Sequence, residues 1–566
     1  MAHATLIPLL CLLSAPLWLV LMARRVYYLA RYFQLEGYES PRFWRWFVRT
    51  RRELRFTAFG AAALLALGAL ALLLSNVLTN SLTDLSSAAR DEVALLLFGA
   101  VALLMAAIWS RMPRDPQVRR PFKHTPRATR LLIAALALGA AAPLYYHLRL
   151  ILSSLGGDLG FSVIGSASSG MLPILLAPLL LPLANALLFP YEEARRRHFM
   201  RKAAQTLRAS GATVIAITGS YGKTSTKHYL HHILSGRFRT YMTPKSYNTL
   251  MGISRAVNDE FARDPYYDYF IAEADAYFVG ENAAICRLVA PKLGIVMSVG
   301  PMHLERLGSM ENIIEAQYEV IEALPPDGVG FFNGDDPHVL AMAARGHPQT
   351  RIIISQRGAQ GARFEAYDVR FGTEGTAFTV RDNASGTTCE MFMPLYGETN
   401  VTNVLMAIAV AAHLGMPLTE IAPRVATLQP AEHRLVRRQL PDGTVIIDDA
   451  YSANPVGTKA ALDVLALHTH SARRIVISSG MFELGAQAEP ANRALGAHMA
   501  KTATDIILIG AQQTAAVREG ALAAGFPPER LRVVENLEEA TAYYRSIAQA
   551  GDTLLLLTDL PDTYAA

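Results

Sequence analysis

The first third of the chain contains five almost uncharged apolar stretches of about 17 to 22 residues. Each is long enough to cross about 30 Å of hydrocarbon as a helix. A helix of a soluble core would keep a polar face, which these stretches lack. We therefore predict an all-α transmembrane bundle with spans at about residues 5–23, 57–74, 93–109, 131–152 and 171–190.

The connections between these stretches alternate in charge. Arginines crowd residues 24–56 and 110–130, whereas residues 75–92 contain only Arg90 and residues 153–170 contain no Lys or Arg. The positive-inside rule then predicts a multi-pass protein of the cytoplasmic (inner) membrane, with its N-terminus outside and everything after about residue 191 in the cytoplasm. A cleaved signal peptide is disfavoured, because Arg24 and Arg25 follow the first apolar run instead of preceding it.

The first basic connection also carries many aromatic residues, among them Tyr27, Tyr28, Trp44 and Trp46. Basic residues mixed with aromatic ones suit a segment in the lipid headgroup layer, where they could contact membrane lipid or an anionic lipid-linked substrate, or only anchor the domain. The net charge of +5 is small for 566 residues, so we expect no nucleic acid partner.

The remaining part of the chain has an ordinary composition and alternates short β-branched runs with helical segments, the α/β pattern. The whole chain has three cysteines, Cys11, Cys286 and Cys389, and they show no CxxC spacing. We therefore expect neither a disulfide framework nor a cysteine zinc site, and a reducing compartment.

A phosphate-binding loop follows the first buried strand of this part. Residues 212–217 form the strand, residues 218–225 read T-G-S-Y-G-K-T-S, and a helix follows through Leu234. Strand, glycine turn, Lys-Thr and helix is the context that such a loop requires. The backbone NH groups would surround phosphate oxygens, Lys223 would reach the β and γ phosphates, and Thr224 would bind Mg²⁺. The predicted nucleotide contacts are Gly219, Ser220, Gly222, Lys223, Thr224 and Ser225.

Further motifs follow the loop in a fixed order. They are Y-F-I-A-E ending at Glu273, H-L-E-x-x-G-S from His303, G-x-x-N-x-x-N-x-x-x-A from Gly397, D-D-A-Y-S-A-N-P from Asp448 and M-F-E-L-G from Met481. With the loop, this series resembles the Mur ligase family, most closely its D-alanyl-D-alanine-adding members, the MurF ligases. The resemblance runs from about Gly211 to the C-terminus.

The resemblance implies an ATP-dependent acid–amino-acid ligase that forms an acyl phosphate, with ATP and Mg²⁺ as cofactors. It implies an ATP-binding P-loop Mur ligase central domain over 211–430 and a Rossmann-like α/β C-terminal domain over 431–566. Before them the sequence itself predicts the transmembrane domain over 1–190 and a connecting helix over 191–210. The amine would be an amino acid or a dipeptide such as D-Ala-D-Ala, and the acceptor a carboxylate of a cell-envelope precursor.

The resemblance also assigns roles to single residues. Lys223, Glu273, His303 and Arg434 would be catalytic, and Thr224, Glu273 and His303 would hold metal. Asn403 would read adenine, Arg434 would contact ATP phosphate, and Asp449 would hold the ribose. Asn248, Asn454 and Gln317 are expected to contact substrate.

The chain departs from the family in four places. Gln317 stands where members have a carbamylated lysine, Thr399 replaces the histidine of G-x-H-N, and the terminal K-G-S-R stretch is absent. The UDP-sugar-binding domain expected before the phosphate loop is also missing, and the membrane domain precedes the loop instead. We hypothesise that the acceptor is polyprenyl-linked and presented at the cytoplasmic face.

Three alternatives remain open from the sequence. The ligase could serve a non-peptidoglycan polymer, as poly-γ-glutamate synthases of the same superfamily do. The altered Gln317 and C-terminal tail allow a catalytically silent ATP-binding membrane scaffold. A P-loop transporter is disfavoured, because we find neither a Walker B strand nor a signature loop.

Overall fold

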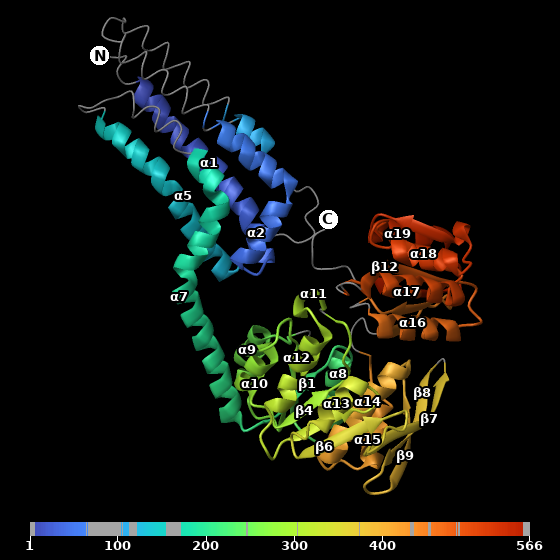
Figure 1. The fold of residues 1–566 in the computed structure, drawn as a ribbon. Helices are drawn as coiled ribbons and strands as arrows, with labels where there is room; N and C mark the ends of the chain where they lie inside the picture. The colour runs from blue at the N-terminus through green and yellow to red at the C-terminus, as the bar shows by residue number, and fades with distance from the viewer. Residues whose placement is uncertain are drawn as a thin grey trace, which may run out of the picture. The chain divides into compact units, whose positions relative to one another are not determined.

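The chain divides into two compact units, Met1–Arg197 and His198–Ala566. The computed structural model (Figure 1) describes residues 6–63, 65, 104, 106–112, 122–153, 171–244, 247–302, 304–372, 374–430, 435–450, 454–482, 484 and 487–558.

In the described residues of the first unit, all regular secondary structure is helical. Its elements are α1 (Leu6–Leu35), α2 (Ser40–Arg49), a helical stretch over 51–63, α5 (Pro126–Ser153) and the first part of α7 (Met171–Ser210). Two described helices, Pro126–Tyr145 and Met171–Ser210, are long and apolar enough to cross a membrane. The predicted stretches at 57–74 and 93–109 lie largely outside the described residues, so a bundle of five spans is not confirmed.

Helix α1 continues through the basic pair that follows the first apolar stretch. The Arg25 guanidinium lies 2.5 Å from the Glu53 carboxylate, with only 1% and 0% of the two side chains exposed. The ring of Phe56 covers the same guanidinium at 4.6 Å. Pairing offsets part of the cost of burying the two charges, and the helix continues past Arg25 to Leu35.

Aromatic side chains of the basic connection pack inside the first unit. Phe33, Phe43 and Phe47 are buried, and Trp46 stacks on Tyr32 with ring centroids 4.0 Å apart. These residues therefore stabilise the fold of the unit, and the position of this segment in the lipid headgroup layer stays a prediction.

Helix α7 is one continuous helix across the predicted boundary between the last span and the connecting helix. Its apolar part contains four prolines, of which three lie beyond the first turn of the helix, and it exposes large side chains at Leu172, Leu176, Leu179, Leu183 and Leu187. Its last turns bury Ala203, Ala204 and Leu207 against residues of the second unit's first sheet and helices. Residues 191–210 are therefore helical, as predicted, but not as a separate element.

The second unit begins with a nine-stranded sheet in the order β2-β3-β1-β4-β5-β6-β7-β8-β9. The pairs from β2 to β7 are parallel, and β7, β8 and β9 are antiparallel. The strands are β1 (Thr213–Thr218), β2 (Thr240–Met242), β3 (Tyr269–Glu273), β4 (Leu293–Val296), β5 (Val329–Asn333), β6 (Thr350–Ser355), β7 (Phe364–Gly372), β8 (Gly375–Asp382) and β9 (Thr387–Met393).

Helices cover both faces of this sheet, because the buried strands are apolar on both sides. Alternation along β1 places Ile215 and Ile217 in one core and Val214 and Ala216 in the other. The helices of this domain are α8 (Lys223–Leu234), α9 (Leu250–Asp259), α10 (Glu281–Val289), α11 (Leu304–Leu307), α12 (Met310–Glu322), α13 (Pro337–Ala344), α14 (Glu398–His413) and α15 (Leu418–Val425).

The last part of the chain forms a six-stranded sheet in the order β10-β11-β15-β12-β13-β14, antiparallel only between β10 and β11. Its strands are β10 (Val436–Gln439), β11 (Val445–Asp448), β12 (Arg474–Gly480), β13 (Asp505–Ile509), β14 (Leu531–Val534) and β15 (Thr553–Thr558). Its helices are α16 (Pro455–Leu467), α17 (Ala488–Thr502), α18 (Ala515–Ala523) and α19 (Leu537–Ile547). Both α/β domains follow the predicted architecture.

Candidate active site

The phosphate loop connects β1 to α8 and depends on two glycines. Gly219 (φ 132°) and Gly222 (φ 86°) both adopt backbone conformations that favour glycine. A Cβ on Gly219 would lie 3.0 Å from Ser298 N, and one on Gly222 only 2.4 Å from Asn403 Oδ1. Neither position therefore has room for a side chain.

Helix α8 begins without a side-chain cap. Its N-cap residue is Gly222, which has no side chain to accept from the first NH groups. The first NH groups of a helix have no partner within it, and the helix dipole adds partial positive charge there. The NH groups of Lys223, Thr224 and Ser225 are consequently oriented to bind an anion.

The loop is attached to the chain that follows β4. Ser220 N donates to Ser298 O at 2.5 Å, and Ser220 Oγ donates to Gly300 O and accepts from Gly300 N, each at 2.9 Å. A Cβ at Gly300 would meet the Tyr221 ring at 2.5 Å. The loop is thus held in shape by its surroundings before any nucleotide contact.

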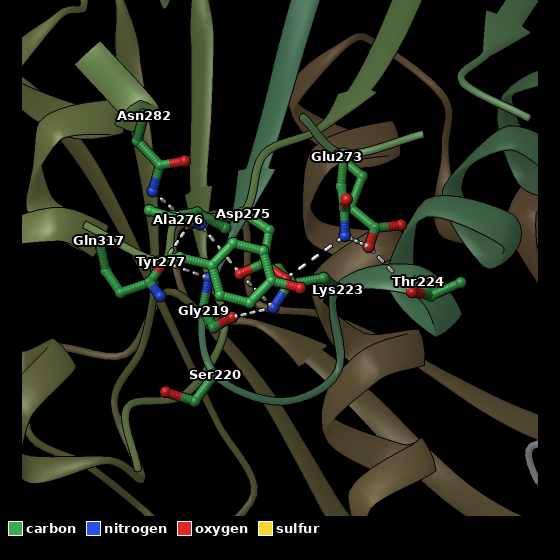
Figure 2. Close-up of polar contacts among 12 residues, drawn as sticks. Gly219, Ser220, Lys223, Thr224, Glu273, Asp275, Ala276, Tyr277, Asn282 and Gln317 are labelled. Carbon is green, nitrogen blue, oxygen red and sulfur yellow. Dashed lines mark hydrogen bonds and ion pairs between the residues drawn. The ribbon is translucent and has the colours of Figure 1, made fainter. Parts of the chain in front are cut away.

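Two lysines of α8 pair with two carboxylates at the end of β3, and Figure 2 shows Lys223, Glu273 and Asp275. Lys223 Nζ lies 3.2 Å from Asp275 Oδ1 and donates to Gly219 O at 2.6 Å. Lys227 Nζ lies 2.9 Å from Glu273 Oε2. All four side chains are at most 8% exposed. We call these four residues the loop charge cluster.

Two polar side chains connect the carboxylates of the loop charge cluster. Thr224 Oγ1 donates to Glu273 Oε1 at 3.0 Å. Asn248 Nδ2 donates to Glu273 Oε1 and to Asp275 Oδ2, each at 3.3 Å. Burial raises the pKa of Glu273, but the charges of Lys227 and Lys223 and the bonds from Lys227 and Thr224 outweigh it, so the net shift is downward. Glu273 is therefore ionised at neutral pH.

Oxygen atoms near the phosphate loop suit a hard divalent cation. The Thr224 hydroxyl and the carboxylates of Glu273 and Asp275 lie together with the Asn248 amide, and Mg²⁺ prefers such ligands. Among the described residues no three His, Cys, Asp or Glu side chains gather in one place to hold a metal ion. His303, the predicted nitrogen ligand, lies outside the described residues.

Gln317 lies at the start of the phosphate loop. Its Oε1 accepts from Gly219 N at 2.9 Å and from the Thr218 hydroxyl, and its side chain is 3% exposed. Asn282 of α10 donates to Thr218 Oγ1 at 3.3 Å and to Ala316 O at 2.8 Å. In this structure Gln317 therefore contacts the loop itself, and its predicted contact with substrate stays a prediction.

Helix α14 brings two asparagines against α8. Tyr229 donates its hydroxyl to Asn400 Oδ1 at 3.0 Å, and Asn400 Nδ2 donates to Tyr396 O at 2.8 Å. Asn403 Oδ1 occupies the space beside Gly222. The residue expected to read adenine is thus next to the phosphate loop.

The C-terminal domain contributes the remaining predicted residues. Asp449 Oδ1 accepts from Leu435 N at 3.1 Å, directly after the four residues 431–434. Asn454 caps α16 by accepting from Gly457 N at 2.9 Å. The contacts that Asp449 and Asn454 were expected to make with ribose and substrate stay predictions. Arg434 lies outside the described residues.

Sequence reasoning missed several members of the site. Lys227 repeats Lys223 one helical turn later, and that spacing could have revealed it. Asp275 follows Glu273 in E-A-D, a second acid directly after a buried strand. Asn282 and Tyr229 carry no comparable signal, because only the folded chain brings them to Thr218 and Asn400.

Comparison with protein families covers both α/β domains. Residues 217–411 match the Mur ligase middle domain, and residues 433–559 match the Mur ligase glutamate ligase domain. The first match begins inside β1, contains the phosphate loop and ends in the last turn of α14.

Two relatives of this chain share one enzyme name. The UDP-N-acetylmuramoyl-tripeptide–D-alanyl-D-alanine ligase of Bacillus subtilis is 29% identical over 349 residues, which are 62% of this chain and 73% of the relative. The ligase of that name from Mycobacterium bovis is 31% identical over 375 residues, which are 62% of this chain and 71% of the relative.

Solved structures show the same fold. MurF from Acinetobacter baumannii aligns with a TM-score of 0.56 and 24% identity over 64% of this chain and 77% of that one. MurF ligase from Thermotoga maritima in complex with ADP aligns with a TM-score of 0.56 and 20% identity over 64% and 80%. With the phosphate loop and its charge cluster, these likenesses establish that the chain belongs to the Mur ligase family of ATP-dependent ligases.

Proposed function

We propose that this chain is a membrane-anchored, MurF-like peptide ligase of cell-envelope precursors. It uses ATP to join a carboxylate to the amine of an amino acid or dipeptide such as D-Ala-D-Ala. The observation that carries the proposal is the phosphate loop with its buried charge cluster, in a chain similar to a UDP-N-acetylmuramoyl-tripeptide–D-alanyl-D-alanine ligase over 62% of its length.

The reaction has two steps that balance. The acceptor carboxylate attacks the γ-phosphorus of ATP, a bond forms between carboxylate oxygen and phosphorus, and ADP leaves as an acyl phosphate forms. The free amine then attacks the acyl carbon, inorganic phosphate leaves with the bonding electrons, and the nitrogen loses one proton. The product is an amide.

The loop residues stabilise the first step. The transferred phosphoryl group spreads negative charge over its oxygens, so positioned donors and cations lower the barrier. The NH groups at the start of α8 and the Lys223 ammonium supply such donors. Thr224 and Glu273, with Asp275 and Asn248 nearby, would hold Mg²⁺. That ion would neutralise charge on the phosphates of the nucleotide.

Anchoring in the cytoplasmic membrane is part of the proposal. Two described helices are long and apolar enough to span, and the leucine series of α7 from Leu172 to Leu187 is exposed in the structure. A monomer in water rarely exposes such a contiguous apolar surface. We infer that membrane lipid covers it, with the N-terminus outside and the ligase domains in the cytoplasm.

Product release tests the ligase activity. Purified full-length protein in detergent should release ADP only when both an acceptor acid and an amine are present. Lys223→Ala should abolish release, because it removes the ammonium from the loop. ADP release without acceptor and amine would contradict the ligase, and absence of turnover with intact ATP binding would instead indicate a catalytically silent scaffold.

A comparison of two acceptor substrates tests whether the acceptor is lipid-linked. A polyprenyl-linked and a UDP-linked muramoyl peptide, each with D-Ala-D-Ala, should differ in rate, with the lipid-linked acceptor faster. Faster turnover of the UDP-linked form would contradict the lipid-linked acceptor while leaving the ligase chemistry intact. Turnover only with glutamate polymers would favour a poly-γ-glutamate-like ligase.

Cysteine labelling tests the topology. Ser385 is exposed in the turn between β8 and β9. In a background with Cys11, Cys286 and Cys389 changed to alanine, Ser385→Cys should react with a membrane-impermeant maleimide only after the cells are permeabilised. Labelling of intact spheroplasts would place the ligase domains outside and contradict the proposed orientation.

A further inference from the structure

We propose that Asp275 is a positioning residue that holds Lys223 and makes nucleotide binding depend on a divalent cation. The inference rests on the proposed nucleotide site and deepens it. It concerns a carboxylate that none of the sequence motifs contains and that lies at the phosphate loop (Figure 2).

Every polar atom of the Asp275 carboxylate has a defined partner. Oδ1 lies 3.2 Å from Lys223 Nζ and accepts from Ala276 N at 3.1 Å, and Oδ2 accepts from Asn248 Nδ2 at 3.3 Å. The side chain is 8% exposed. A carboxylate fixed by three donors cannot turn away, so Lys223 is held in one place.

Lys223 keeps one donor for a ligand. An ammonium group has three hydrogens, and the recorded contacts of Nζ are to Asp275 Oδ1 and Gly219 O. Gly219 O belongs to the phosphate loop, so the Lys223 ammonium lies within hydrogen-bond distance of the loop backbone. Asp275 therefore places the lysine where a phosphate oxygen would bind.

The same carboxylate opposes a bound polyphosphate. The loop charge cluster contains two positive and two negative side chains, so its formal charge is zero. When a nucleotide binds without a cation, the charge of Lys223 is already offset by Asp275, so the lysine attracts the phosphates less strongly. A divalent cation bound with the nucleotide would offset the two carboxylates, so the cation and the nucleotide should bind cooperatively.

Calorimetric titration of ADP into full-length protein in detergent, with and without Mg²⁺, measures this coupling. Asp275→Asn keeps the size of the side chain and removes its charge. We expect it to tighten binding of metal-free ADP and to reduce the Mg²⁺-induced gain in affinity by about tenfold, within the usual range for coupling between two ligands. Asp275→Glu keeps the charge and should retain the gain.

Two further variants keep the test decisive. Asp275→Ser removes the same charge with a smaller side chain and should repeat the result if Asp275→Asn does not fold. Asp327→Asn removes an exposed carboxylate paired with Lys292 and should change neither affinity. An equal loss of ADP affinity with and without Mg²⁺ would show a merely structural role and overturn the inference, whereas wild-type protein that binds no ADP under either condition would overturn the nucleotide site as well.

Discussion

Lys227 Nζ lies 2.9 Å from Glu273 Oε2, and the two side chains are 0% and 2% exposed. Removing one partner of such a pair leaves a buried charge without compensation. Lys227→Met should therefore lower the free energy of unfolding of the full chain by about 3–5 kcal/mol at pH 7.5, as measured by denaturant titration in detergent.

The pH dependence of this loss follows from the lowered pKa of Glu273. A carboxyl group whose pKa is lower in the folded state stabilises the fold above its unfolded pKa, and this stabilisation is lost as the pH falls. Lys227→Met should consequently cost less at acidic pH, where Glu273 is protonated. Lys292→Met breaks an exposed pair with Asp327 and should cost under about 1 kcal/mol. An equal cost for both variants would contradict the argument.

Gln317 supports the phosphate loop through its amide oxygen. Gln317→Leu leaves Gly219 N and the Thr218 hydroxyl without their buried acceptor. Each such group costs about 1–3 kcal/mol, so ADP affinity and stability should both fall. Gln317→Glu keeps an acceptor at this position and should restore most of the affinity. The absence of any effect from Gln317→Leu would show that the loop does not depend on it.

The glutamine at position 317 also predicts that the activity of the wild-type protein does not depend on bicarbonate. A primary amide is not carbamylated, so turnover of the wild-type protein should not change when carbon dioxide and bicarbonate are removed from the assay. The matched variant is Gln317→Lys, whose activity should rise with added bicarbonate if the lysine becomes carbamylated. Bicarbonate dependence of the wild-type protein would contradict the prediction.

His228 should make stability fall in mild acid. Burial, the charge of Lys227 and a nearby His231 lower its pKa to about 4, with Glu273 opposing them. The unfolded chain takes up the proton near pH 6.5 and the folded chain does not, so protons favour unfolding as the pH falls. Between pH 7 and pH 5 the loss should be about 2 kcal/mol. His228→Gln should remove that part of the pH dependence in denaturant titrations, and an unchanged profile would speak against it.

The leucine series of α7 should tolerate no charge. Leu179 is 51% exposed in the apolar part of the helix. An arginine near the centre of a span costs about 2.5–3.5 kcal/mol in insertion, so Leu179→Arg should reduce the protein recovered in carbonate-washed membranes. Gln205→Arg adds the same charge to an exposed position near the other end of α7 and should have no effect. Equal recovery of both variants would argue against a membrane around α7.

Local patterns predicted much of the second unit. The phosphate loop, the strand before it and the helix after it are neighbours in sequence, and the structure confirms both α/β domains. The partners of the loop come from distant segments. Lys227 finds Glu273, and Gln317 finds Gly219, only because β3 and α12 pack beside β1 and its loop. No spacing in the sequence encodes those pairs.

The first unit shows the limits of hydropathy. A window of apolar residues ends at Arg24 and Arg25, but α1 continues to Leu35, and Arg25 is buried in a pair with Glu53 beside the ring of Phe56. Hydropathy scores residues one at a time and cannot include a partner from another segment. The same limitation separated α7 into a span and a connector, although no residue between them ends the helix.

The contact between Gly222 and Asn403 has a consequence for how related sequences can diverge. The two positions are far apart in the chain, yet Asn403 Oδ1 fills the space that any larger residue at 222 would need. A substitution of the glycine would also strain a backbone with positive φ. Shortening Asn403 would relieve the collision but not the strain. Gly222 should therefore be retained even in relatives that carry a smaller residue at 403, whereas a larger residue at 222 should not occur beside an asparagine at 403.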